Sequence, residues 1–208
     1  MIFEINKIKD LELEKVYEEG MRELNDFFGL DWKRNLPKLF IVSDRKSIDG
    51  LFGRKTEDFV VGWVDKNNDV YLLSRENYEK ESSHKYSDEE YFALFKHEIA
   101  HCFSKIVGDF SKNPIWLFEG ISIFLSGQNK LKIKPKKYDS FLNSYNKHNK
   151  DVYKEAGFAV EFLVKEYGKE KLIELIKKVK TTDSEEDFAE LFKRIYNFRL
   201  EYSNFKII

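Results

Sequence analysis

The sequence is poor in cysteine, in long apolar runs and in net charge. It has one cysteine, Cys102, among 208 residues, which excludes an intramolecular disulfide and a cysteine-rich zinc module. No apolar run approaches the 18 residues that indicate a transmembrane helix. The first 15 residues contain acidic side chains from Glu4 onward and no apolar core segment, which argues against a signal peptide. These absences favour a soluble, cytoplasmic protein.

The balance of charges narrows the range of partners. The chain has 36 lysines and arginines against 37 acidic residues, a formal net charge of −1. Such a balance gives no reason to expect a nucleic acid or an anionic membrane as partner. The hydrophobic fraction of 42% is ample for a core and excludes general disorder. We expect a single domain over 1–208, with the strands in 1–110 and a mostly helical part in 111–208.

Apolar periodicity and helix-capping residues predict an α+β fold with its strands early in the chain. Asp10 is suited to begin a helix that Gly29 ends, and Ser87 with Glu90 forms a capping box. Asn113 is expected to cap the next helix, with Pro114 at its first position. In chain order we expect helix 11–28, strand 37–44, hairpin strands 58–65 and 69–74, and helices 87–107, 113–127, 152–166, 169–180 and 184–198.

The segment His97-Glu98-Ile99-Ala100-His101 contains the residues best suited to chemistry. Two histidines four residues apart project from the same side of a helix, where both imidazoles can reach one metal ion. Glu98 lies about 100° around the helix, so it can touch a water at the metal without being a ligand. The alternative is a pair of surface histidines on an ordinary amphipathic helix.

The rest of this helix supports the metal-site hypothesis. Its apolar residues form a stripe centred nearly opposite the two histidines. This stripe consists of Phe92, Phe95, Ile99, Cys102, Phe103 and Ile106. We therefore expect the stripe to rest on the core while the histidines face an open side.

A second feature is Glu119, the only charged residue in the apolar segment 113–127. A helix that is apolar on every face is expected to be buried. A lone buried carboxylate costs several kcal/mol unless it is paired, protonated or bound to a metal. A third zinc ligand would remove that cost, although pairing with a lysine or partial exposure would also do so. Gly120, unfavourable inside a helix, predicts a close approach to the histidine-bearing helix.

These residues resemble a known family. The stretch His97-Glu98-x-x-His101, 17 further residues and then Trp116-Leu-x-Glu119-Gly-x-Ser-x-Phe resembles the gluzincin metallopeptidases, most closely the thermolysin-like, peptidase MA-like proteins. The strand pair 62–64 and 70–73 and the helix 153–168 resemble neighbouring parts of the same family. The likeness covers about residues 37 to 180.

The resemblance implies a zincin-like fold, in which a small mixed sheet precedes the HExxH helix and a helical C-terminal part. It implies Zn²⁺ held by His97, His101 and Glu119, with Glu98 as general base. It also places an oxyanion-stabilising residue near Tyr153, with His148 as the competing candidate. Two features depart from the family: Ile123 stands where thermolysin has an aspartate that orients a zinc histidine, and no glycine-rich amine-binding motif is visible.

The expected function is zinc-dependent hydrolysis of peptide bonds in a peptide or protein substrate. The substrate would extend along a sheet edge, which we place at Val60–Val64. Three alternatives stay open: an inactive relative that binds or regulates, a regulatory protease specific for one cellular protein, and a zinc hydrolase acting on another amide. The lysine-rich segment from Lys130 to Lys150 is expected to be a solvated connection, with a basic lip for acidic substrates as the alternative.

Overall fold

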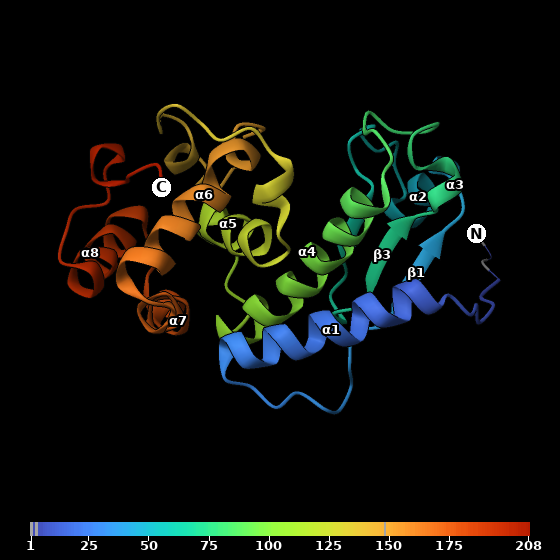
Figure 1. The fold of residues 1–208 in the computed structure, drawn as a ribbon, viewed down its shortest axis with the longest axis horizontal. Coiled ribbons are helices and arrows are strands. Elements are labelled where there is room, and N and C mark those ends of the chain that lie inside the picture. Colours follow the sequence, from blue (N-terminus) through green and yellow to red (C-terminus); the bar gives the residue numbers. More distant parts are fainter. Residues whose placement is uncertain (1, 3, 148) are drawn as a thin grey trace.

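The computed structural model describes residues 2, 4–147 and 149–208, which form an α+β fold (Figure 1). The N-terminal helix, the small sheet and the long helix α4 occupy one end of the molecule, and helices α5 to α8 occupy the other (Figure 1). The elements are α1 (Leu11–Phe28), β1 (Leu39–Val42), α2 (Arg45–Phe52), β2 (Gly62–Val64), β3 (Val70–Leu73), α3 (Arg75–Tyr78), α4 (Asp88–Val107), α5 (Ile115–Leu125), η1 (Gln128–Leu131), η2 (Phe141–Asn143), α6 (Val152–Tyr167), α7 (Lys169–Lys178), η3 (Val179–Thr181), α8 (Glu185–Tyr196) and η4 (Tyr202–Asn204).

The sheet among these residues has three strands in the order β1-β3-β2. β1 runs parallel to β3, and β2 pairs with β3 in antiparallel register, Gly62 opposite Leu72. The predicted hairpin is therefore confirmed, and β2 lies at one edge of the sheet. The strand expected over 58–65 is shorter than predicted, because the main-chain carbonyls of residues 57, 58 and 60 bind the Arg45 side chain instead of a strand.

Capping residues set the starts of the helices much as predicted. Asp10 accepts a hydrogen bond from the Leu13 amide at 3.0 Å, and Ser87 accepts one from the Glu90 amide at 3.1 Å. The prediction that Asn113 caps the next helix was wrong. The first amides of α5 instead donate to the main-chain carbonyls of residues 144 and 145, so no side-chain cap is needed.

Helix α4 lies between α1 and α5, and α5 packs in turn on α6 (Figure 1). Phe95, Ile99 and Phe103 of the predicted apolar stripe are fully buried. α5 is buried along most of its length, which agrees with its apolar sequence. Within the described part of the chain, no helix combines the length and the apolar character needed to cross a bilayer.

Gly120 is required for a close approach, but the predicted neighbour was wrong. A Cβ atom added to Gly120 would lie 2.6 Å from the Ala156 carbonyl oxygen and 2.8 Å from Val160 Cγ2. Both atoms belong to α6, not to the histidine-bearing α4. On the opposite side of this contact, a Cβ on Gly157 would collide with Ile123 of α5. The two glycines let α5 and α6 pack closely enough to hold Glu119 in place.

The segment 130–147, the main described part of the predicted solvated connection, is partly buried in the core. Tyr138 and Phe141 of this segment are buried in the core, although many of its lysines are exposed. The Glu155 carboxylate of α6 accepts hydrogen bonds from the main-chain amides of Asp139, Ser140 and Phe141 at 3.0 to 3.3 Å. This carboxylate fixes the segment against the start of α6.

Candidate metal centre

Two histidines of α4 face each other across one helical turn. The Nε2 atoms of His97 and His101 are 3.0 Å apart, and the ring planes are nearly perpendicular, at 80°. Their four-residue spacing on an α-helix accounts for this arrangement. Two imidazole nitrogens this close to each other form a pair that a shared cation would stabilise.

Helix α5 brings Glu119 to the same point. Its Oε2 atom lies 3.5 Å from His97 Nε2 and 3.6 Å from His101 Nε2. The three residues that the sequence predicts as metal ligands are therefore together in the structure, and they form a group that could hold a metal ion. The close packing of α5 on α6 determines the position of Glu119.

The spacing of the three donor atoms fits a small divalent cation. Atoms separated by 3.0, 3.5 and 3.6 Å share a centre about 2.0 Å from each of them, which matches zinc–nitrogen and zinc–carboxylate bonds. Imidazole and carboxylate donors also suit zinc chemically. Three protein ligands leave a further coordination position for water or substrate, as in catalytic rather than structural zinc sites.

The support around the ligands is incomplete on one side. Metal-bound histidines usually donate their second ring N–H to a carboxylate or carbonyl. Nδ1 of His97 is buried and has no hydrogen-bond partner among the described residues. Ile123, the position that would supply an aspartate in thermolysin, is fully buried and offers no polar atom. His97 is therefore oriented by packing and by its contacts with His101 and Glu119.

Glu119 and His101 stabilise each other's charged forms. Burial alone would raise the pKa of Glu119, but attraction and hydrogen bonding from His101 and His97 outweigh it and hold the pKa far below its usual value. Burial would lower the pKa of His101, and the negative charge of Glu119 reverses this and raises the pKa. The pair thus preserves an anionic carboxylate inside the protein, which is the form that binds a cation.

Glu98 is buried next to the ligands and is in contact with strand β2. Burial raises the pKa of Glu98 above its usual value, against the attraction of His97 and His101. A Cβ atom added to Gly62 would lie 3.2 Å from Glu98 Oε1 and 2.9 Å from Leu72 Cδ2. The absence of a side chain at Gly62 therefore leaves the space that the Glu98 carboxylate occupies.

Tyr153 lies in the first turn of α6, as the resemblance suggested, and 36% of its surface is exposed. Burial of its ring raises the pKa of the phenol, and the negative charges of Glu119 and Glu98 raise it further. Tyr153 therefore lies within electrostatic range of both carboxylates. His148, the competing candidate, lies outside the described residues.

The remaining histidine and the cysteine are not part of this group. His84 Nε2 lies 3.1 Å from the main-chain oxygen of Phe59, in the loop region that precedes α4. Burial raises the pKa of Cys102 to about 12, so its thiol is unreactive at neutral pH. Neither residue is expected to take part in the chemistry.

Sequence reasoning missed the contribution of Gly62 to the site. A glycine inside a short β-rich run is a known sign of close approach by another group, so the signal was present. It could not show which group approaches. The structure identifies the approaching groups as the side chains of Leu72 and Leu94 and the carboxylate of Glu98.

The site is largely closed to solvent. The side chains of His97, Glu119 and His101 are 8%, 12% and 16% exposed, so His101 is the most accessible of the three.

Comparison of the chain with protein-family models, with curated proteins and with solved structures finds no match.

Proposed function

We propose that this protein is a zinc-dependent metallopeptidase of the gluzincin type with a zincin-like fold. The observation that carries the proposal is the meeting of His97, His101 and Glu119 around one point, with Glu98 beside them. Two histidines, one glutamate ligand and an adjacent buried glutamate base are the components of metal-assisted amide hydrolysis.

His97, His101 and Glu119 would hold the metal through Nε2, Nε2 and Oε2. When bound, zinc supplies Lewis acidity toward the scissile carbonyl and lowers the pKa of a water molecule toward neutrality. The burial of the three ligands limits competing water and strengthens the electrostatic interactions inside the site.

Glu98 is the general base in this proposal. Its carboxylate accepts the proton of the attacking water and then delivers it to the leaving amine. Its raised pKa suits this double role, because a base with a pKa closer to neutrality both accepts and releases a proton readily. The space left by Gly62 keeps the carboxylate beside β2, where an extended substrate would lie.

Tyr153 is the electrophilic partner in this proposal. Its raised pKa keeps the phenol protonated at neutral pH, so it can donate a hydrogen bond. A donor aimed at the carbonyl oxygen of the scissile bond stabilises the negative charge that develops there.

The substrate is a peptide or protein segment in extended conformation, consistent with a cytoplasmic protein that acts on polypeptides. β2 is an edge strand, and an extended peptide can add to its unpaired side by main-chain hydrogen bonds.

The proposal is tested by measuring hydrolysis of a peptide library by zinc-loaded protein, with cleavage products identified by mass spectrometry. We expect defined cleavage that a chelator abolishes and added zinc restores. Cleavage that persists in excess chelator would contradict a metal-dependent mechanism. Zinc binding without cleavage of any peptide or protein would favour the inactive, binding relative.

A further inference from the structure

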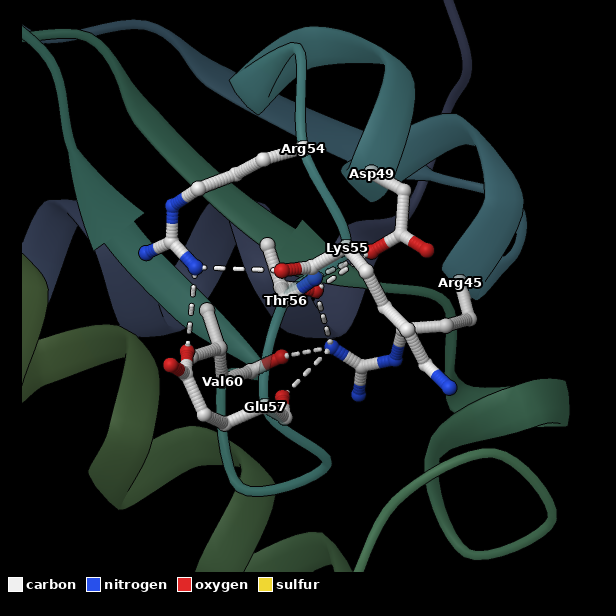
Figure 2. A network of polar contacts seen from close by, with 7 residues as sticks. All are labelled: Arg45, Asp49, Arg54, Lys55, Thr56, Glu57 and Val60. Atoms are coloured by element: carbon white, nitrogen blue, oxygen red, sulfur yellow. Dashed lines mark hydrogen bonds and ion pairs between the residues drawn. The ribbon is translucent and has the colours of Figure 1, made fainter.

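The Arg45 side chain, in the first turn of α2, makes an unusual set of contacts. Its guanidinium donates hydrogen bonds to the main-chain oxygens of Glu57, Asp58, Val60 and Glu81 and to Thr56 Oγ1, at 2.6 to 3.2 Å. All five acceptors are neutral oxygens. Figure 2 shows one guanidinium nitrogen directed at Thr56, Glu57 and Val60 together.

These contacts fix the loop that leads into β2. Most side chains of residues 53–59 are exposed, so apolar packing contributes little to the loop's conformation. Thr56 is the exception: its amide and hydroxyl both donate to Asp49 Oδ1 of α2 at 2.7 Å. The loop is therefore attached to α2 at two points, at Thr56 through Asp49 and at 57–60 through Arg45 (Figure 2).

The pairing of β2 with β3 determines which of its main-chain groups are free. The Leu73 amide donates to the Val61 oxygen, and the Asp65 amide donates to the Asp69 oxygen. Because hydrogen-bonded positions alternate along an antiparallel pair, Val61 and Asp65 face β3. Gly62 and Val64 therefore direct their amides and carbonyls to the unpaired edge of β2.

Val60 would extend this free edge by alternation, but its main-chain groups are occupied. Its oxygen accepts from Arg45 Nη1 at 2.6 Å, and its amide donates to the Glu57 oxygen at 3.1 Å. The edge predicted over Val60–Val64 is thus shorter than that range. It ends at Gly62, the residue whose missing side chain makes room for Glu98.

We propose that Arg45 is a positioning residue that ends the peptide-pairing edge at Gly62, so that substrates pair with Gly62 and Val64 and no further. Three consecutive residues of an extended peptide are enough to reach both positions, because paired positions alternate. The substrate class is therefore a short extended segment whose recognition does not increase with length past Gly62. The substrate in this inference rests on the proposed peptidase function. The length of the edge rests only on the hydrogen bonds of Arg45 and Val60.

The first test measures main-chain hydrogen exchange in the full chain without substrate. In the wild-type protein the Val60 amide should be protected, while the Gly62 and Val64 amides exchange rapidly. Arg45→Met keeps the aliphatic stem and removes every donor, so protection of Val60 should fall at least about tenfold. Unchanged protection of Val60 in a folded Arg45→Met protein would overturn the proposal, whether or not the protein cleaves peptides.

The second test uses zinc-loaded protein and peptides lengthened one residue at a time on each side of the cleaved bond. On the side that runs past Gly62 toward Val60, added residues should change kcat/KM less than about twofold in the wild type. In Arg45→Met the freed Val60 groups lengthen the edge, so the same added residues should lower KM at least about threefold and change kcat less than about threefold, because the edge binds substrate but does not react. Arg45→Lys keeps the charge but not the forked donors, and it should resemble Arg45→Met.

Thr56→Val is the matched control, since it removes the hydroxyl's bonds to Asp49 and Arg45, while the amide of residue 56 stays bonded to Asp49 and Arg45 stays bonded to Val60. It should leave KM within about twofold of wild type. An equal dependence of KM on peptide length in Thr56→Val would show that general loop stability, not Arg45, controls binding, and would overturn the proposal. A wild-type protein that shows the expected exchange pattern but hydrolyses nothing would instead contradict the proposed peptidase function.

Discussion

Two buried glutamates on neighbouring helices have opposite surroundings. Glu155 of α6 is 6% exposed and accepts hydrogen bonds from three main-chain amides of residues 139–141. Glu119 of α5 is 9% exposed, and its partners are two imidazole nitrogens. Main-chain amides can only donate to a carboxylate, whereas imidazole nitrogens can pair with a carboxylate or bind a metal ion.

The comparison shows that burial of a charge does not by itself identify a functional site. Both carboxylates avoid the cost of isolated burial, but only Glu119 does so through groups that can themselves be metal ligands. We infer that Glu155 is structural and propose that Glu119 is functional. The predictions below separate these two roles, and they run from the largest expected effect to the smallest.

The largest effect should come from Glu98, which is beside the ligands but is not one of them. Glu98→Gln preserves the shape and burial of the side chain and removes its ability to accept a proton. Hydrolysis should fall at least about a hundredfold, the usual scale for a general base, while zinc content stays unchanged. Equal kcat for Glu98→Gln and wild type, measured by steady-state kinetics, would exclude Glu98 from the mechanism.

Glu155→Ala should destabilise the fold instead of the chemistry. It leaves three main-chain amides of the segment 139–141 without their acceptor, at a cost of about 3 kcal/mol in the free energy of unfolding. Urea denaturation measures this loss, and the folded variant should still bind zinc. Glu166→Ala, on the exposed face of the same helix, is the control and should change stability less than about 0.5 kcal/mol.

Tyr153→Phe tests whether the phenol acts on the transition state. A donor that binds only the developing oxyanion contributes to kcat and little to KM. The variant should lower kcat between about ten- and a hundredfold, with zinc content unchanged because the hydroxyl is not a ligand. If kcat stays within about twofold of wild type, Tyr153 is only a packing residue. His148→Ala, measured in parallel, would then show whether the oxyanion role belongs to His148.

The smallest effect should come from Gly62→Ala. The added methyl would lie 2.9 Å from Leu72 Cδ2 and 3.2 Å from Glu98 Oε1, closer than most real contacts, so the leucine and the carboxylate both have to shift. A small displacement of a base lowers kcat, here by about tenfold, and leaves zinc affinity unchanged. Wild-type kcat in a folded Gly62→Ala protein would show that Glu98 is not confined by β2.

The sequence predicted those features of the structure that depend on residues close together in the chain. The helix starts at Asp10 and Ser87 depend on residues three positions away, and both were confirmed. The meeting of His97, His101 and Glu119 was also predictable, because a helical repeat and one lone charge in an apolar helix are readable from the chain.

The parts that could not be predicted depend on main-chain atoms of distant segments. The contacts of Arg45 and Glu155 go to carbonyls and amides, which every residue carries, so no residue type reveals them. Gly120 signalled a close approach without showing that the partner is α6. Asn113 was a plausible cap whose role is filled by carbonyls about 30 residues later.

The most direct test of the central claim is zinc binding measured by titration calorimetry and metal analysis on wild type, Glu119→Ala and Glu155→Ala. Wild type and Glu155→Ala should each bind about one zinc per chain, and Glu119→Ala should lose most of this binding. This result would show that zinc binding requires Glu119 and does not require the similarly buried Glu155. If Glu119→Ala holds zinc as tightly as wild type, Glu119 is not a ligand and the proposed metal centre is wrong.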